Sequence, residues 1–187
     1  DDTRKKVEAE MGLIDNIVSS KSLEEGYLEL KDRHIEDHSN LFGRNTVELN
    51  CNPSDFALMT DDLLNSYKEG NHSNYLEILL YQYGRYMLVA SSRPGTLPAH
   101  LQGVWNTYNS APWSCNYTQN INVQMNYWPA FSTNLAETFE AYMEYNQAYM
   151  EAAEKWADLA VVWNGFSSKY NTDGGNGWVI GHAANPY

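Results

Sequence analysis

The sequence predicts an all-α fold of helical hairpins joined by long loops. Apolar residues recur at three- and four-residue steps over several long segments, which is the spacing of helices that bury one face. Serine or asparagine precedes such segments and glycine or proline follows them, as at helix ends. The 187 residues suffice for one domain, and hydrophobic and aromatic fractions of 43% and 13% are typical of a folded protein.

The first helices follow from apolar spacing and from signals at their ends. Ser22 and Glu25 form a capping box, which predicts a helix that ends at Gly43. Residues 75–91 are the most apolar helical segment, and their mixed apolar surface predicts burial on more than one side. A helix over residues 4–19 is predicted by a stripe of apolar side chains: Val7, Met11, Ile14 and Val18.

Two further helices are predicted in the C-terminal half. One starts near Thr118 and ends before Pro129, because the residue before a proline resists helical geometry. Asn134, with Glu137 three positions later, forms a second box of the same kind. It predicts a long helix that runs to about Leu159.

The segments between these helices are predicted to be irregular or extended. Residues 45–49 favour a short strand or extended piece, residues 50–54 a turn, and residues 60–74 a polar connection. Prolines and glycine open a long loop over residues 94–116, which we interpret as functional because it is neutral and rich in aromatic residues. Residues 171–177 are a loop rich in glycine and asparagine.

The charges are distributed unevenly along the chain. Twelve basic and 24 acidic residues give a net charge of −12, and without a basic cluster this excludes a typical nucleic-acid-binding surface. No apolar run approaches the ~20 residues of a membrane-spanning helix. Residues 94–136, the neutral segment, contain no Asp, Glu, Lys or Arg, and His100 is their one ionisable side chain besides a thiol and phenols. This segment holds half of the six tryptophans: Trp105, Trp113 and Trp128.

Asparagines cluster near the end of the neutral segment. On a helix Asn122 and Asn126 share a face, while Asn120 lies in the first turn and projects toward the loop. An amide donates to and accepts from hydroxyl groups, and an indole face covers the apolar side of a pyranose ring. The cluster therefore indicates either a sugar site or a polar helix end with capping asparagines and core aromatics.

Two histidines form a weaker candidate site. His34 and His38 lie one helical turn apart, but a metalloprotease needs glutamate directly after the first histidine, where this chain has Ile35. No third ligand is evident nearby, so we favour a structural helix face and expect no metal or other cofactor. Cys51 and Cys115 are too few for a disulfide framework, and the sequence leaves their pairing open.

A series of ordered motifs resembles glycoside hydrolase family 95, whose members are α-L-fucosidases and some α-L-galactosidases. The similarity covers nearly the whole chain, from residues 34–44 near its start to residues 175–179 near its end. The most specific matching segments are 81–86, 91–99, 101–106, 112–113, 120–122 and 125–130.

The resemblance implies a partial (α/α)6 toroid, built of helical hairpins with long active-site loops. Residues 1–187 are then a fragment of a single catalytic domain, with a preceding β-sandwich domain and the rest of the toroid not present. The implied reaction is the hydrolysis of terminal α-1,2-linked L-fucose, or L-galactose, from oligosaccharides with inversion.

The resemblance also implies roles for individual residues. In the family an asparagine, assisted by a distant aspartate, positions the attacking water, and a glutamate is the acid. Asn120 and Asn122 match the motif asparagines, and Asn122 is the better candidate for the water. Thr118 stands where fucose-selective members can carry histidine near C6 of the sugar, which leaves L-galactose open. The implied substrate contacts are Thr118, Trp105, Asn126, Trp178 and His182.

The acid glutamate and the helper aspartate of the family are expected beyond residue 187, so Glu137 and Glu140 are interpreted as helix-surface residues. The fragment alone is therefore expected to be inactive. The expected partners are an oligosaccharide substrate and the remainder of the same polypeptide or a complementing chain. The family implies an extracellular or cell-surface location in a bacterium. The competing hypothesis is a non-catalytic helical module for carbohydrate binding or assembly, which a lack of those two carboxylates would favour.

Overall fold

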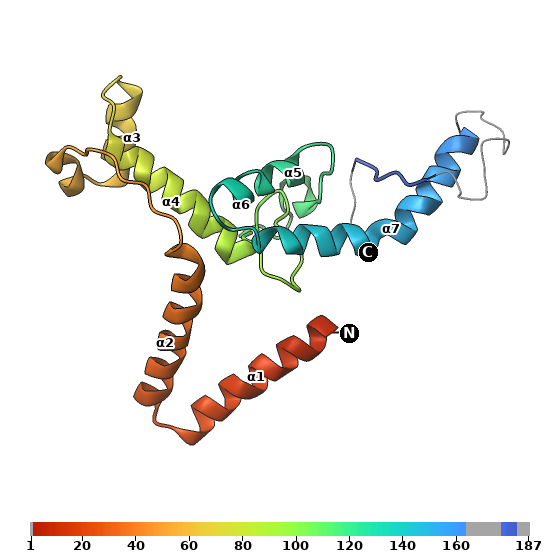
Figure 1. The fold of residues 1–187 in the computed structure, drawn as a ribbon, viewed down its shortest axis with the longest axis horizontal. Coiled ribbons are helices and arrows are strands. Elements are labelled where there is room, and N and C mark those ends of the chain that lie inside the picture. Colours follow the sequence, from red (N-terminus) through yellow and green to blue (C-terminus); the bar gives the residue numbers. More distant parts are fainter. Residues whose placement is uncertain (1, 164–176, 183–187) are drawn as a thin grey trace. The chain divides into compact units, whose positions relative to one another are not determined.

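The computed structural model describes residues 2–163 and 177–182, and the regular elements in this part are helices (Figure 1). An isolated antiparallel bridge joins His100 to Gly103. The all-α prediction is therefore confirmed. In chain order the elements are α1 (Asp2–Ser20), α2 (Leu23–Phe42), the 3-10 helix η1 (Pro53–Ala57), α3 (Thr60–Lys68), α4 (Asn74–Ser91), the 3-10 helix η2 (Pro112–Cys115), α5 (Asn122–Tyr127), α6 (Pro129–Ser132) and α7 (Thr138–Trp163).

The chain divides into two units, which are described separately. The first comprises Thr3–Val89 and the second Ala90–Tyr187. None of the described helices combines the length and the apolar character needed to cross a membrane. The closure of these helices into an (α/α)6 toroid stays a prediction.

The helices of the N-terminal half lie where the sequence predicts them. The capping box at the start of α2 is confirmed: the Glu25 backbone N–H donates to Ser22 Oγ at 3.3 Å, and the Ser22 N–H donates to the Glu25 carboxylate at 3.1 Å. Gly43 ends the same helix and donates its N–H to Leu41 and Ser39 carbonyls. Helix α4 covers the predicted residues 75–91.

Two segments of the first unit differ from the prediction. Residues 45–49 are irregular and form no strand. A strand needs a neighbouring strand for its peptide groups, whereas the Asn45 carbonyl accepts a hydrogen bond from Arg85 Nη1 at 2.9 Å. The segment 60–74, predicted as a polar connection, contains α3, whose two first-turn aspartates favour a helix N-terminus and whose Leu63 is buried.

The predicted cap at Asn134 is wrong. Its φ of 58° lies in the left-handed region, which asparagine tolerates better than most residues. An N-cap residue is extended instead, so α7 begins later, at Thr138, whose Oγ1 donates to the Leu135 carbonyl at 2.7 Å. The helix then continues past the predicted Leu159 to Trp163.

The helix predicted from Thr118 begins at Asn122. The Thr118 carbonyl accepts the Val123 N–H at 3.1 Å, and the Gln119 N–H donates outside the helix, so the first predicted residues form a turn. The helix ends at Tyr127, before Pro129 as predicted, but Trp128 itself is helical, with φ of −54° and ψ of −39°, and α6 starts at Pro129.

The second unit packs α5 and α6 against α7 through aromatic rings. Tyr127 of α5 stacks on Tyr142 of α7, with 5.4 Å between ring centroids and 23° between planes. Phe131 of α6 lies 5.1 Å from Phe139 of α7, again between centroids. Several smaller core side chains of this unit have no exposed surface: Val123, Ala130, Leu135, Ala141 and Ala153.

A buried arginine organises the first unit. Arg85 of α4 is 2% exposed and lies at the C-terminus of α2, where helix carbonyls lack partners within their own helix. Its Nη1 lies 2.9 Å from the carbonyl oxygens of Phe42 and Asn45 and from Gln82 Oε1, while Nη2 reaches the Leu41 carbonyl at 3.5 Å. The guanidinium also lies over the Phe42 ring, 4.9 Å from its centroid. Arg85 therefore joins α4 to the end of α2.

We predict that Arg85→Lys lowers the free energy of unfolding by about 2–3 kcal/mol, because one ammonium group cannot reach the acceptors that the guanidinium fork serves and leaves buried carbonyls unpaired. Urea unfolding of the full-length protein, followed by circular dichroism, measures the change. The control is Arg4→Ala, since Arg4 makes an exposed ion pair with Glu8, and such pairs contribute under about 1 kcal/mol. Equal losses in the two variants would contradict the proposed role of Arg85.

Candidate active site

The predicted site residues all lie in the second unit, in the neutral segment and in residues 177–182 (Figure 1). Asn120, Asn122 and Asn126 are exposed, as are Trp178 and His182. Trp105 is 42% exposed, whereas Thr118 is buried at 8% exposure. Amide and indole groups are thus open to solvent in this unit, as contact with a sugar requires.

The backbone of the asparagine motif is anchored on two sides. The Gln119 N–H donates to the His182 carbonyl at 2.9 Å, which ties the motif to residues 177–182. On the other side Gln124 Nε2 donates to the Gln119 carbonyl at 2.5 Å, and Val123 is fully buried. These contacts hold the motif in place, and its two asparagine side chains are not needed to anchor it to other elements.

The two motif asparagines differ in their contacts. Asn120 Oδ1 accepts the N–H of the adjacent Ile121 at 2.8 Å. The side-chain oxygen therefore bonds the backbone of the motif, and the NH₂ group takes no part in this bond. Asn122 is the first residue of α5, and among the described residues its side chain has no hydrogen-bond partner. Asn122 therefore offers both its carbonyl oxygen and its NH₂ group to a ligand.

Side chains of α5 hold the loop that precedes the motif. The Ala99 N–H donates to the Tyr127 hydroxyl at 2.7 Å, and Asn126 Nδ2 donates to the Ala99 carbonyl at 3.1 Å. The same amide lies 3.3 Å from the His100 carbonyl. A further hydroxyl, Ser92 Oγ, lies 2.8 Å from the Tyr127 oxygen. Asn126, predicted as a substrate contact, thus bonds the loop in this structure.

The loop then turns tightly at His100, whose side chain is half-buried. His100 and Gly103 exchange backbone hydrogen bonds of 3.0 and 2.9 Å, and His100 Nδ1 accepts the Gln102 N–H at 3.1 Å. Burial lowers the pKa of His100 below its ordinary value, which favours the uncharged ring at neutral pH. Because Nδ1 is the acceptor, the proton of the neutral ring lies on Nε2.

Trp105 packs directly on this turn. Gly103 has a φ of +68°, and a Cβ added to it would lie 2.8 Å from Cε3 and Cζ3 of the Trp105 indole. The Trp105 N–H donates to the Gln102 carbonyl at 3.2 Å, which fixes its backbone. Glycine is therefore required here for conformation and for space, and it lets the indole lie against the turn with part of its surface exposed.

One carboxylate makes a hydrogen bond to this loop, and the bond holds the backbone of the loop. Glu144 of α7 accepts the Gly95 N–H at 2.9 Å and so anchors the start of the loop. The neutral segment itself supplies no carboxyl group. The described contacts therefore provide no proton donor for the Asn122 region.

Sequence reasoning missed the hydroxyls of Tyr127 and Ser92. Both residues are buried, at 2% and 0% exposure. Tyr127 follows the predicted site residue Asn126, and Ser92 follows the last residue of α4. A buried tyrosine needs a partner for its hydroxyl, but the sequence does not show that Ala99 supplies it. His182 was predicted as a substrate contact, and its backbone carbonyl, rather than its ring, bonds the motif.

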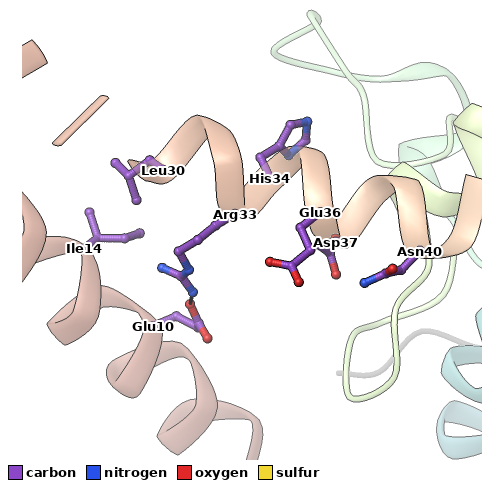
Figure 2. Close-up of a pocket in the computed structure, with 8 residues that line it drawn as sticks. All are labelled: Glu10, Ile14, Leu30, Arg33, His34, Glu36, Asp37 and Asn40. Carbon is purple, nitrogen blue, oxygen red and sulfur yellow. Dashed lines mark hydrogen bonds and ion pairs between the residues drawn. The ribbon is translucent and has the colours of Figure 1, made fainter. Parts of the chain in front are cut away.

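A groove of about 640 Å³ lies between α1 and α2 of the first unit (Figure 2). Arg33 Nη2 of α2 donates to Glu10 Oε2 of α1 at 3.2 Å. The rings of His34 and His38, both on α2, stack with 6.1 Å between their centroids. Across residues 2–163 and 177–182 no group of three or more His, Cys, Asp or Glu is arranged to hold a metal ion. The lining residues are Glu10, Ile14, Leu30, Arg33, His34, Glu36, Asp37 and Asn40.

Curated proteins similar to this chain are named as fucosidases. "Probable alpha-fucosidase A" of Aspergillus niger is 36% identical over 142 residues, which are 75% of this chain and 18% of that protein. The protein of the same name from Aspergillus oryzae is 34% identical over 165 residues, 87% of this chain and 21% of its own length. "Alpha-L-fucosidase 2" of Arabidopsis thaliana is 36% identical over 157 residues, 82% and 17% of the two chains.

The chain thus spans about a fifth of the length of these relatives. Residues 26–187 match the family model described as the glycosyl hydrolase family 95 catalytic domain, which leaves only α1 and the start of α2 outside the match. This chain belongs to glycoside hydrolase family 95, and residues 26–187 correspond to part of its catalytic domain.

Proposed function

We propose that this chain supplies the water-positioning part of the active site of an inverting α-L-fucosidase-like glycosidase. The observation that supports the proposal most directly is the pair Asn120 and Asn122, exposed on an anchored backbone within a segment that carries no acidic or basic side chain. The proposed substrate is an oligosaccharide with a terminal α-1,2-linked L-fucose or L-galactose.

Inversion requires two groups on opposite sides of the sugar, an acid that protonates the leaving oxygen and a group that activates water. In the proposed mechanism Asn122 Oδ1 accepts a hydrogen bond from the attacking water and orients its lone pair toward the anomeric carbon. An amide is a poor base, so the proton of the water passes to a carboxylate that assists the asparagine. We propose that this carboxylate and the acid glutamate belong to parts of the protein outside residues 1–187.

The neutral segment suits an uncharged sugar. Exposed amides exchange hydrogen bonds with hydroxyl groups, and the open face of Trp105 covers the apolar side of the pyranose ring. Thr118 lies at the start of the motif and is 8% exposed, and we propose that this small exposed part faces C6 of the sugar. L-Galactose carries a hydroxyl at C6 that L-fucose lacks, so this position is proposed to set the preference between the two.

The family and the greater length of the relatives support the remaining proposals. A β-sandwich domain precedes the chain, and further helices complete the (α/α)6 toroid and its active site. An extracellular or cell-surface location in a bacterium is proposed from the family alone. The relatives described above are fungal and plant proteins, so they do not support the bacterial source.

We predict that Asn122→Ala in the full-length protein lowers kcat on 2′-fucosyllactose about 100-fold or more and changes KM little, because the variant loses orientation of the water rather than the sugar contacts. Steady-state release of L-fucose measures both constants. Asn65→Ala is the matched control, since Asn65 is an exposed asparagine of α3.

Unchanged turnover in Asn122→Ala would exclude the assigned role. A wild-type protein that binds the oligosaccharide without any turnover would instead favour the non-catalytic binding module. In that case the glutamate and aspartate partners would also be missing from the sequence after residue 187.

We predict that Thr118→His shifts the ratio of kcat/KM values about tenfold toward an L-fucoside over the matching L-galactoside, since the larger ring occupies space beside C6. Thr118→Ser, which keeps the hydroxyl and adds no bulk, is expected to retain the wild-type ratio. The two substrates compete in one reaction mixture, and product analysis gives the ratio directly. An unchanged ratio in Thr118→His would place C6 away from this residue.

We predict that Gly103→Ala raises KM several-fold and changes kcat less, because the added Cβ displaces the Trp105 indole that stacks on the sugar. Gly70→Ala is the control, since Gly70 also has a positive φ, of +96°, but nothing lies within 4 Å of the position that an added Cβ would take. Both variants carry the backbone strain of a left-handed alanine, about 1 kcal/mol. A rise in KM of equal size in the two variants would contradict the role of Trp105.

A further inference from the structure

The peptide group of Ala99 is held on both sides by neighbouring residues of α5. Its N–H donates to the Tyr127 hydroxyl at 2.7 Å, and its carbonyl accepts Asn126 Nδ2 at 3.1 Å. Ala99 is 4% exposed and Tyr127 2%, so water cannot readily replace the contact between them. We call this pair of hydrogen bonds the Ala99 clamp.

The clamp acts on the helix that carries the proposed water-positioning residue. Helix α5 has six residues, begins at Asn122 and ends at Tyr127. A helix this short is not stable by its own hydrogen bonds, so tertiary contacts decide where it lies. Asn122 and Asn126 are one turn apart on the same face, and a shift at one end of α5 therefore moves the other.

The clamp also acts on the loop that carries the proposed sugar platform. Asn126 Nδ2 reaches the His100 carbonyl at 3.3 Å, and His100 pairs through its backbone with Gly103, on which the Trp105 indole lies. The two bonds thus join the indole side of the site to the asparagine side.

We infer that Tyr127 and Asn126 are positioning residues that fix the distance between the sugar platform and the attacking water. This inference rests on the proposed function. Neither side chain needs to touch the substrate, since each acts through the Ala99 peptide. Misplacement of a reacting group by about 1 Å costs as much as 100-fold in rate, so loss of the clamp is expected to lower kcat while most sugar contacts, and hence KM, are kept.

The substitution Tyr127→Phe removes the hydroxyl and keeps the ring that stacks on Tyr142. In the full-length protein we expect kcat on 2′-fucosyllactose to fall about ten- to 100-fold, with KM within about twofold of wild type. Tyr149→Phe is the matched control, because Tyr149 is a half-buried tyrosine of α7 with a stacked ring, on Tyr145. It is expected to leave both constants unchanged.

A second variant tests the other bond. Asn126→Asp keeps the shape of the side chain, and its ionised carboxylate cannot donate to the Ala99 and His100 carbonyls. The positioning role predicts a fall in kcat with KM nearly unchanged. A substrate contact at Asn126 predicts the opposite, a rise in KM with kcat nearly unchanged, and that result would overturn the inference for this residue.

Amide hydrogen exchange of the peptide that contains Ala99 provides a readout that does not depend on activity. Exchange is expected to accelerate about tenfold or more in Tyr127→Phe and to stay at the wild-type rate in Tyr149→Phe. Unchanged exchange in Tyr127→Phe would overturn the clamp itself. Accelerated exchange with unchanged kcat would overturn the positioning role alone.

The two proposals fail in different ways. If the wild-type full-length protein hydrolyses neither the fucoside nor the galactoside, the proposed function falls, and the exchange rates still decide whether the clamp exists. If the wild type is active and Asn122→Ala is not, while Tyr127→Phe and Asn126→Asp behave as wild type, the proposed function holds and this inference is overturned.

Discussion

A buried peptide group without partners is costly, and the second unit meets this constraint at Ala99 with two side chains of α5. The Tyr127 hydroxyl accepts the N–H and the Asn126 amide donates to the carbonyl. The loop around Ala99 is irregular and has no neighbouring strand or helix turn to take up these groups. Its placement therefore depends on side chains. We infer that the positions of the exposed Trp105 indole and the exposed Asn122 amide depend on that placement.

Under the proposed function, the neutral segment recognises a sugar and supplies no carboxyl group for transfer of a proton. Amides and indoles form hydrogen bonds and stacking contacts with an uncharged ring and do not introduce charges that would have to be desolvated. The carboxylate of Glu144, which does reach this loop, accepts a backbone N–H and stabilises the loop start. Proton transfer at a glycosidic bond needs carboxyl groups, so under the proposed function these groups are expected outside the neutral segment.

The sequence predicted the features that depend on local patterns. The capping box of Ser22 and Glu25 and the apolar spacing of α4 act over a few residues, and both helices appear where they were predicted. The burial predicted for α4 is incomplete, since Leu80 and Tyr83 are 54% and 57% exposed. Asn134 shows the limit of local signals, because the same residue type caps helices and adopts left-handed turns, and the structure has the left-handed conformation. The asparagine motif was predicted, and the roles assigned to its side chains stay predictions.

Local sequence patterns did not predict the contacts between residues that are far apart in the sequence. The backbone acceptors of the Arg85 guanidinium lie 40 to 44 residues earlier in the chain, and the hydrogen-bond donor to the Tyr127 hydroxyl lies 28 residues earlier. Composition indicates that a buried arginine or tyrosine needs partners, but only the folded chain identifies them. Tyr127 and Ser92 were missed for this reason, although both stand inside the segments by which the family was recognised.

The neutral ring of His100 has a consequence for the whole site. Burial lowers the pKa of His100, so its ring is uncharged down to a lower pH than the ring of an ordinary histidine. With His100 uncharged, residues 94–136 carry no charged side chain of Asp, Glu, Lys, Arg or His. Under the proposed function, the groups that give turnover its dependence on pH are then expected outside the neutral segment.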